Sequence, residues 1–495
     1  MKKIVSVLLA LVMCMSLCAV AWATDPSVAK VGENKYTDLH EALEAAVDGG
    51  TVELLSSVTL TGEWTPVGNN AAPFTGTING NKHTITGLTI NGSANYAGLI
   101  GVLSGGAVAD LKFASVSVSG GSDVGAVVGR IINGGKVSNV HILSGTVTGA
   151  KRVGGVAGSI IACGDAISCT NAAAVNATER NAGGIVGSAY YTETGKTMNI
   201  TGCINTGTVT ANGVAGGIVS LSSANVSGNK NAAEVRGTEV GGIVGEQKSY
   251  GSVTNNTNTG NIVNTSSGGY GAGGIVGWLR YHGTSEADAY PVSDIITVSG
   301  NNNSGNVTGG NDAGGIIGTV YNSAVILANI NTAQTLSGAT FAAGIVGNYQ
   351  VTEVPAAAGP ANNKVTFRSD NTSATPLESI NAQCKALLIY DNTASATDPD
   401  ASRVEYTDVP QQPPVTPDPV NPNPDPVNPD PTPVKPERPD HPIRRYPAAT
   451  TTAETTTDGT DVTSAKTFDG GVMLYAGMAL TSAVGMAWIG KKREQ

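Results

Sequence analysis

Small and aliphatic residues recur along the chain in a six-residue pattern that is clearest over residues 182–187, Ala-Gly-Gly-Ile-Val-Gly. Nine near-copies of this pattern begin at Tyr96, Val124, Val153, Ala182, Ala215, Val240, Ala272, Ala313 and Ala342. Their starts are separated by 28, 29, 29, 33, 25, 32, 41 and 29 residues. A period of this length predicts one structural unit stacked many times rather than a single closed core.

Two positions of the pattern are always aliphatic. The fifth holds only Ile, Val or Ala, and the fourth holds Leu99, Val127, Val156, Ile185, Ile218, Ile243, Ile275, Ile316 and Ile345. This uniformity predicts that both positions are buried. The second and third positions are Gly or Ala in every copy, which indicates a corner that needs either an unusual φ or a close approach between coils.

The residues between two copies form short stretches that favour strands. In the unit 240–271 the copy is followed by Ser252–Gly260 and Asn261–Asn264, both rich in Asn, Thr and Val. Three short strands in about 30 residues suit one coil of a parallel β-helix, in which each strand pairs with its equivalent in the next coil. We therefore predict an all-β chain folded as a right-handed parallel β-helix of about nine repeats.

The segment before the first copy combines a helix with strands. Residues 36–50 place Leu39, Leu43 and Val47 on one helical face, after Thr37 or Asp38 as N-cap, and Gly49 or Gly50 can end the helix. Such a helix would cover the exposed end of the solenoid. Short strands are expected over 51–55, 58–61, 75–78, 83–85 and 88–90.

A polar column lies downstream of six of the copies. It reads Cys169-x-Asn171, Cys203-x-Asn205, Asn229-x-Asn231, Asn256-x-Asn258, Asn301-x-Asn303 and Asn329-x-Asn331. Stacked Asn side chains can hydrogen-bond along the solenoid as a ladder. The alternative is an exposed polar strip that binds carbohydrate.

Cysteines occupy one position of this column in consecutive coils. If the register holds, the Cα atoms of Cys169 and Cys203 lie about 5 Å apart, within the range for a disulfide. Cys163 is a competing partner, and Cys384 is expected to be unpaired.

Both ends of the chain read as targeting segments. Residues 1–23 have a basic start, an apolar run and Ala21-Trp22-Ala23, which predicts a signal peptide. An uncharged apolar run over 470–490 precedes Lys491-Lys492-Arg493 and is long enough for a transmembrane helix with a cytoplasmic tail, 491–495. We expect no cofactor.

The remaining boundaries follow composition. Residues 24–95 form the N-terminal cap and first coils, 96–350 the repeats, and 351–408 the C-terminal cap, with last strands near 365–368 and 387–390. Prolines then dominate, and residues 409–465 predict an extended Pro/Thr-rich stalk without a fold.

The C-terminal region resembles the sorting region of Gram-positive wall-anchored proteins. It departs from them because residues 465–470, Ala-Lys-Thr-Phe-Asp-Gly, stand where Leu-Pro-x-Thr-Gly is required. The resemblance implies a protein on the extracellular surface of a Gram-positive bacterium, anchored to the cell membrane by residues 470–490.

The copies also resemble the GLUG motif of bacterial surface proteins, most literally at Gly98-Leu99-Ile100-Gly101. The resemblance covers about 75–350 and implies an adhesin-like β-helix without implying an activity. Residues 31–55 are similar to the openings of pectate-lyase-like β-helix proteins.

Charge and aromatic content narrow the choice of partner. The net charge of -10, with no basic run outside the termini, excludes a nucleic-acid partner. The segments after the copies vary in length and carry a large share of the aromatic residues: Tyr190, Tyr191, Tyr250, Trp278, Tyr281, His282, Tyr321 and Tyr349. Equivalent loops of a solenoid emerge on one side, so these rings could form a ridge for stacking on sugars, or each could cover its own coil.

These features predict a monomeric adhesin or scaffold that binds host or wall glycan or extracellular protein, with no catalytic residues. The alternative is a polysaccharide lyase or glycoside hydrolase on a β-helix, which needs paired carboxylates or an acidic site beside a base. Its best candidates are Asp110, Asp123 and Arg130. The residues that directly precede the copies do not form a uniform ligand column.

Overall fold

The computed structural model describes residues 26–192, 196–248, 251–268, 271–280, 296–321 and 324–350, and the short segments 365–368, 371–375, 389–391 and 404–407. All of them belong to the compact unit Met1–Val415. The predicted signal peptide, stalk, transmembrane helix and tail lie outside the described residues. Within that described part, no helix is both long and apolar enough to cross a membrane.

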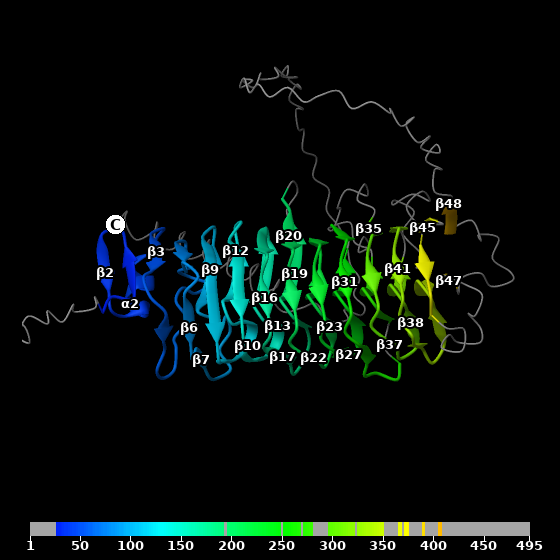
Figure 1. The fold of residues 1–495 in the computed structure, drawn as a ribbon, viewed down its shortest axis with the longest axis horizontal. Coiled ribbons are helices and arrows are strands. Elements are labelled where there is room, and N and C mark those ends of the chain that lie inside the picture. Colours follow the sequence, from blue (N-terminus) through cyan, green and yellow to red (C-terminus); the bar gives the residue numbers. More distant parts are fainter. Residues whose placement is uncertain are drawn as a thin grey trace, which may run out of the picture. The chain divides into compact units, whose positions relative to one another are not determined.

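The described chain is a parallel β-helix built from three sheets (Figure 1). One coil shows the plan: β28 (Glu239–Gly241), β29 (Val244–Lys248), β30 (Ser252–Thr254), β31 (Thr257–Asn258) and β32 (Ile262–Asn264). We call the three sheets A, B and C. In this coil β30 and β31 belong to sheet A, β29 belongs to sheet B, and β28 and β32 belong to sheet C. Each pairs in parallel with its equivalent in the next coil, as β29 does with β34 (Val276–Arg280). The predicted all-β solenoid is therefore confirmed.

The N-terminal end carries the predicted helix, α2 (Leu39–Ala45). The Asp38 side chain caps it by accepting hydrogen bonds from the backbone N–H groups of His40 and Glu41, at 2.7 and 3.1 Å. Leu39, Ala42 and Leu43 are buried against the first strands. The helix ends before Gly49, which has a φ of 109° and takes part in a separate turn.

The irregular ends of the solenoid also follow the sequence pattern. The first strands are β1 (Ala29–Val31), β2 (Asn34–Tyr36), β3 (Thr51–Leu54), β4 (Val58–Thr59), β5 (Thr77–Asn79), β6 (Thr84–Thr86) and β7 (Thr89–Ile90). Strand β1 pairs antiparallel with both β2 and β3, whereas β3 already pairs in parallel with β5. At the other end, β45 (Val365–Arg368), β47 (Ile389–Asp391) and β48 (Val404–Thr407) extend the sheets beyond the last copy.

The aliphatic positions of the repeat form the core. The side chains at the fourth position, from Leu99 to Ile345, are all 0% exposed, and so are those at the fifth position, from Ile100 to Val346. Burial of an aliphatic side chain contributes roughly 1.5 to 3 kcal/mol, so these two columns together contribute roughly 3 to 6 kcal/mol in each coil.

Two Asn ladders run along the inside of sheet A. The first contains Asn229, Asn256, Asn301, Asn329 and Asn371, and the second contains Asn171, Asn205, Asn231, Asn258, Asn303 and Asn331. In each ladder the Nδ2 of one side chain donates to the Oδ1 of the next at 2.8–3.0 Å. All of these residues are at most 2% exposed. The ladder prediction is confirmed, and the exposed carbohydrate-binding strip is wrong because these side chains do not reach solvent.

The second ladder also closes a turn in every coil. At Asn258, for example, Nδ2 donates to the carbonyl oxygen of Gly260 at 2.9 Å, and Oδ1 accepts from the Gly260 N–H at 3.3 Å. Together with the bonds to Asn231 and Asn303, these contacts use both amide protons and both acceptor sites of the side chain. No polar capacity of the buried amide is left over, which removes the desolvation cost of an unpaired group.

The glycines of the repeat are explained by close approach. Neither Gly241 nor Gly242 is among the described residues with positive φ. A Cβ atom on Gly242 would lie 2.0 Å from the carbonyl oxygen of Gly274 in the next coil and 2.4 Å from Cγ of Asn258. At Gly184 the same distances are 2.1 Å, to Gly217, and 2.4 Å, to Asn205. The third position of the repeat is therefore the surface against which the second ladder packs.

We predict that Gly242→Ala destabilises the solenoid by about 3 kcal/mol, because backbone of the next coil must move to admit the methyl group. The measurement is the urea midpoint followed by circular dichroism. Gly268→Ala is the matched control, since a Cβ atom there would have no atom within 4 Å. Equal midpoints for the two variants would contradict the close-approach explanation.

Candidate functional site

Two of the residues in the predicted aromatic ridge are buried. Tyr349 is 0% exposed and Trp278 is 6% exposed, so neither ring offers a free face to a ligand. Tyr190 is half-buried in β19 (Val186–Thr192). Tyr191 in β19 and Tyr321 in β39 (Ile317–Tyr321) have no described side chains, and Tyr250, Tyr281 and His282 lie outside the described residues.

A polar seam, which the sequence did not reveal, runs where sheets B and C meet. It combines the residue directly before each copy with the residue seven positions later on sheet B. The pairs in which both members are polar are Asp123 with Arg130, Arg152 with Ser159, Asn181 with Ser188, Glu239 with Glu246, and Asp312 with Thr319. The strand register stacks the second members in one column, for example Glu246 opposite Trp278 and Trp278 opposite Thr319.

At the N-terminal end of the seam, Asp123 is held by two arginines. Its carboxylate accepts hydrogen bonds from Arg130 at 2.6 Å and from Nε of Arg152 at 2.7 Å. Burial raises the pKa of Asp123, but the hydrogen bond and charge of Arg152 and the charge of Arg130 outweigh it and leave that pKa below its ordinary value. The Arg130 guanidinium also lies over the Tyr96 ring, 4.6 Å from its centroid.

The candidates of the enzyme alternative do not come together. Asp123 and Arg130 form the buried ion pair just described, with 0% and 7% exposure. Asp110 lies in β9 (Ala107–Ala114) of sheet A, where it accepts a hydrogen bond from Asn139. Asp123 instead lies in β10 (Val116–Gly125) of sheet C. The trio therefore does not form one site.

Near the middle of the seam, two glutamates, two basic groups and a Trp form what we call the central cluster: Glu239, Glu246, Lys248, Trp278 and Arg280. The Glu246 carboxylate forms an ion pair with the Arg280 guanidinium at 2.7 Å and lies 3.7 Å from the Lys248 amine. The Arg280 guanidinium stacks on the Trp278 ring at 4.1 Å from the centroid. Trp278, one of the predicted ligand residues, thus supports an arginine rather than a sugar.

The two glutamates of the central cluster differ in their environment. Burial and the charge of Glu246 raise the pKa of Glu239 to about 7, although Arg280 and Lys248 partly oppose the shift. Glu246 keeps a basic partner at ion-pair distance. A carboxyl group whose pKa is raised toward neutrality is a feature that general acid–base catalysis uses.

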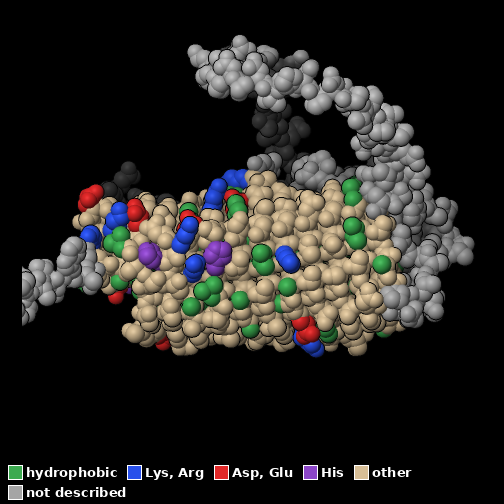
Figure 2. Space-filling model, viewed as in Figure 1, with side chains coloured by type: hydrophobic (Ala, Val, Ile, Leu, Met, Phe, Trp, Pro, Cys, Tyr) green, Lys and Arg blue, Asp and Glu red, His purple; other side chains and the backbone are tan. Residues whose placement is uncertain are grey.

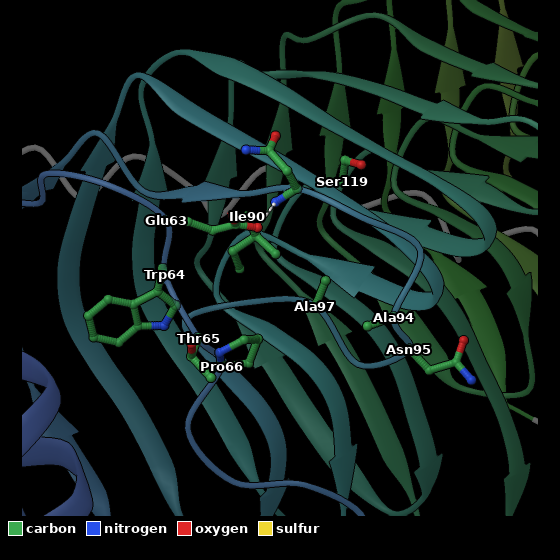
Figure 3. A pocket seen from close by; sticks show the side chains of 10 residues that line it. Glu63, Trp64, Thr65, Pro66, Ile90, Ala94, Asn95, Ala97 and Ser119 are labelled. Carbon is green, nitrogen blue, oxygen red and sulfur yellow. Dashed lines mark hydrogen bonds between the residues drawn. The ribbon is translucent and has the colours of Figure 1, made fainter.

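A pocket of about 200 Å³ lies on the first coils (Figure 3). We call it the N-terminal pocket, and its lining is Glu63, Trp64, Thr65, Pro66, Ile90, Asn91, Ala94, Asn95, Ala97 and Ser119. Figure 3 shows that these residues come from separate segments of neighbouring coils. No sequence pattern predicts this pocket, because most of its lining residues precede the first copy at Tyr96.

The walls of the N-terminal pocket are held in place by hydrogen bonds. The Glu63 carboxylate accepts from the Asn91 N–H at 3.1 Å, and the Asn95 side-chain oxygen accepts from the Ser122 N–H at 2.9 Å. Trp64 donates from Nε1 to the Leu99 carbonyl oxygen at 3.0 Å and is 8% exposed. The pocket therefore presents fixed oxygen acceptors beside an apolar floor.

The cysteines sit as expected but are not bonded to each other. Cys169 and Cys203 are both 0% exposed and are free thiols in the structure, and Cys163 is a half-buried free thiol. Hydrogen bonding to Cys169 and burial raise the pKa of Cys203 well above its ordinary value. The Cys169–Cys203 disulfide stays a prediction, and Cys384 lies outside the described residues.

Among the residues with described positions, no three His, Cys, Asp or Glu side chains converge where a metal ion could bind.

Comparisons with known proteins give only partial likenesses. No family model matches the chain. Over 110 residues it is 40% identical to halomucin of Haloquadratum walsbyi, which covers 22% of this chain and 1% of halomucin. It is similar in structure to a Bacteroides ovatus protein named as a candidate immunoglobulin A1 protease, with 17% identity, a TM-score of 0.31, and coverage of 63% of this chain and 80% of that one. A TM-score of 0.31 is too low to argue from, and the GLUG resemblance stays a prediction.

Glu239 makes the stability of the solenoid depend on pH. Because its folded-state pKa is about 7 against an ordinary 4.5, the folded protein holds a proton that the unfolded chain releases, and stability falls as the pH rises between these values. In the unmodified chain we expect the free energy of unfolding to fall by at most about 3 kcal/mol between pH 5 and pH 8 because of Glu239. We predict that Glu239→Gln removes this fall. Urea midpoints across this range measure it, with Glu33→Gln, at an exposed glutamate, as control. An unchanged pH slope in Glu239→Gln would contradict the prediction.

Proposed function

We propose that this chain is a cell-surface β-helical protein that binds extracellular glycan, and that the N-terminal pocket is the binding site. One observation carries the proposal: fixed carboxylate and amide oxygens line a small pocket together with apolar side chains. Sugars present hydroxyl groups at their edges and apolar C–H groups on their faces, so a glycan needs both kinds of contact.

The dimensions of the pocket fit a single sugar unit. Its volume of about 200 Å³ lies below the roughly 300 to 1,000 Å³ of pockets that enclose drug-sized ligands. Glu63 and Asn95 already have their orientation fixed by backbone donors, so little conformational freedom is lost on binding. One terminal or branching sugar of a longer glycan is therefore the proposed occupant.

The proposed placement on the cell surface rests on the two ends of the chain. The signal-like residues 1–23, the proline-rich residues 409–465 and the apolar span 470–490 are together typical of a protein held outside the membrane on a stalk. A rigid solenoid on such a stalk would act as an adhesin or scaffold for host or wall glycan, and extracellular protein is the other partner class that this architecture suits.

The proposal predicts that Ala94→Tyr abolishes glycan binding, because the exposed Ala94 lines the pocket and a Tyr ring would fill it. The measurement is the binding of the mature chain to a glycan array, followed by titration calorimetry on the hits. Ala232→Tyr, at an exposed alanine of another coil, is the matched control and should bind as the unmodified chain does. Retained binding in Ala94→Tyr would rule out the pocket as the site.

A glycoside hydrolase is the second candidate function, favoured by the glutamate pair of the central cluster. There, Glu239 would protonate the leaving oxygen of the glycosidic bond, and Glu246 would supply the second carboxyl group that this chemistry needs. Incubation with pectins, glycosaminoglycans and mucin glycans should then release new reducing ends, and Glu239→Gln should remove this activity. If the unmodified chain releases no new reducing or unsaturated ends, the hydrolase and lyase alternatives both fail.

A further inference from the structure

The outer surface of sheet A changes character along the solenoid. In the N-terminal coils it carries Lys112, Lys136, His141 and Asp165. In the coils from β20 (Met198–Thr201) to β41 (Ile330–Asn331), the described sheet A strands contain one charged residue, Lys230. Figure 2 shows the same change, with charged side chains gathered toward the N-terminal half of the visible face.

Amide and hydroxyl side chains replace the charges and stand in rows. One row contains Asn199, Asn225, Ser252 and Thr297, and the next contains Thr201, Ser227, Thr254 and Ser299. We call these two rows the amide–hydroxyl face. Its side chains are half-buried, so they are accessible but held by their neighbours.

Hydrogen bonds within the rows orient five of these eight side chains. The Nδ2 of Asn225 donates to Oδ1 of Asn199 at 3.3 Å, and the Ser252 hydroxyl donates to Oδ1 of Asn225 at 3.3 Å. In the second row the hydroxyls of Thr201 and Ser227 lie 3.2 Å apart. Successive coils of a β-helix lie about 4.8 Å apart, so the face offers donors and acceptors at a regular spacing along one line. Such preordered groups lose little entropy when a ligand binds.

The chemistry of the face selects among classes of partner. Without charge it attracts neither nucleic acid nor an anionic polysaccharide. A stable protein interface needs a central group of buried aromatic, Arg or aliphatic anchors, but the exposed aliphatic side chains here, Ile204 and Ile330, stand at opposite ends of the stretch. Hydroxyls and amides both donate and accept, as the hydroxyls of a sugar do.

From this we infer that the amide–hydroxyl face binds a linear, uncharged polysaccharide laid along the solenoid axis, each sugar contacting side chains of one or two coils. The inference rests on the proposed glycan-binding function and extends it from a single-sugar pocket to a polymer track. Because each contact is weak and the contacts repeat, the affinity rises with the number of sugars that reach the face.

The test uses the full chain and a series of neutral linear glucan oligosaccharides from disaccharide to octasaccharide, with heparin and polygalacturonate as charged comparisons. We expect affinity for the neutral series to rise steadily with length and to exceed that for either charged polymer. The double variant Ser227→Glu/Thr254→Glu should lower affinity for the longest glucan at least tenfold. The matched control is Thr308→Glu/Ser337→Glu, an adjacent exposed pair on sheet C, which should leave it unchanged.

The outcomes separate this inference from the proposed pocket. A loss in the face variant but not in Ala94→Tyr supports the track and removes the pocket. A loss in Ala94→Tyr alone, or an affinity that does not change with glucan length, overturns the track while the pocket stands. Equal losses in the face variant and the sheet C control also overturn the track. Stronger binding of a charged polymer overturns it as well, and so does capture of a matrix protein without any glucan.

Discussion

The second Asn ladder packs directly on the third-position glycines of the repeat, and this contact recurs in the coils from Gly155 to Asn331. Each ladder amide packs on the Cα of a glycine in the repeat, as Asn258 does on Gly242, and reaches the next amide at 2.8–3.0 Å. A methyl group at that glycine would occupy the place of the amide. The buried polar ladder therefore explains the third-position glycines from Gly155 to Gly315.

The same contact accounts for the copy whose third position is not glycine. The equivalent of the ladder Asn is Ile142 in an earlier coil, paired with Asn171 in the strand register, and there the third position of the copy is Ala126 instead of Gly. In the first ladder, Cys169 and Cys203 take the place of Asn before the amides begin at Asn229. Apolar coils give way to amide-linked coils along one continuous β-helix.

The fold could be predicted from the sequence because its determinants repeat. Nine copies average out local exceptions, and the columns of Ile, Asn and Gly identify buried positions directly. The functional features could not be predicted, because they depend on contacts that no periodicity encodes. Glu239 and Glu246 are seven residues apart in the chain and lie on strands of two different sheets. Their charges interact because the coil turns from sheet C to sheet B between them. Most of the lining of the N-terminal pocket precedes the first copy, and the burial of Trp278 depends on its neighbours in adjacent coils.

The most direct test of the ladder compares two neighbouring residues of β36 (Asn302–Asn303). Asn303 is buried in the second ladder, whereas Asn302 is exposed on the same strand. Asn303→Ala leaves buried partners unpaired on both sides and should destabilise the solenoid by about 2 to 4 kcal/mol, while Asn302→Ala should change stability by less than about 0.5 kcal/mol. Urea unfolding of both variants provides the comparison. Similar midpoints for the two would show that the buried ladder does not hold the coils together.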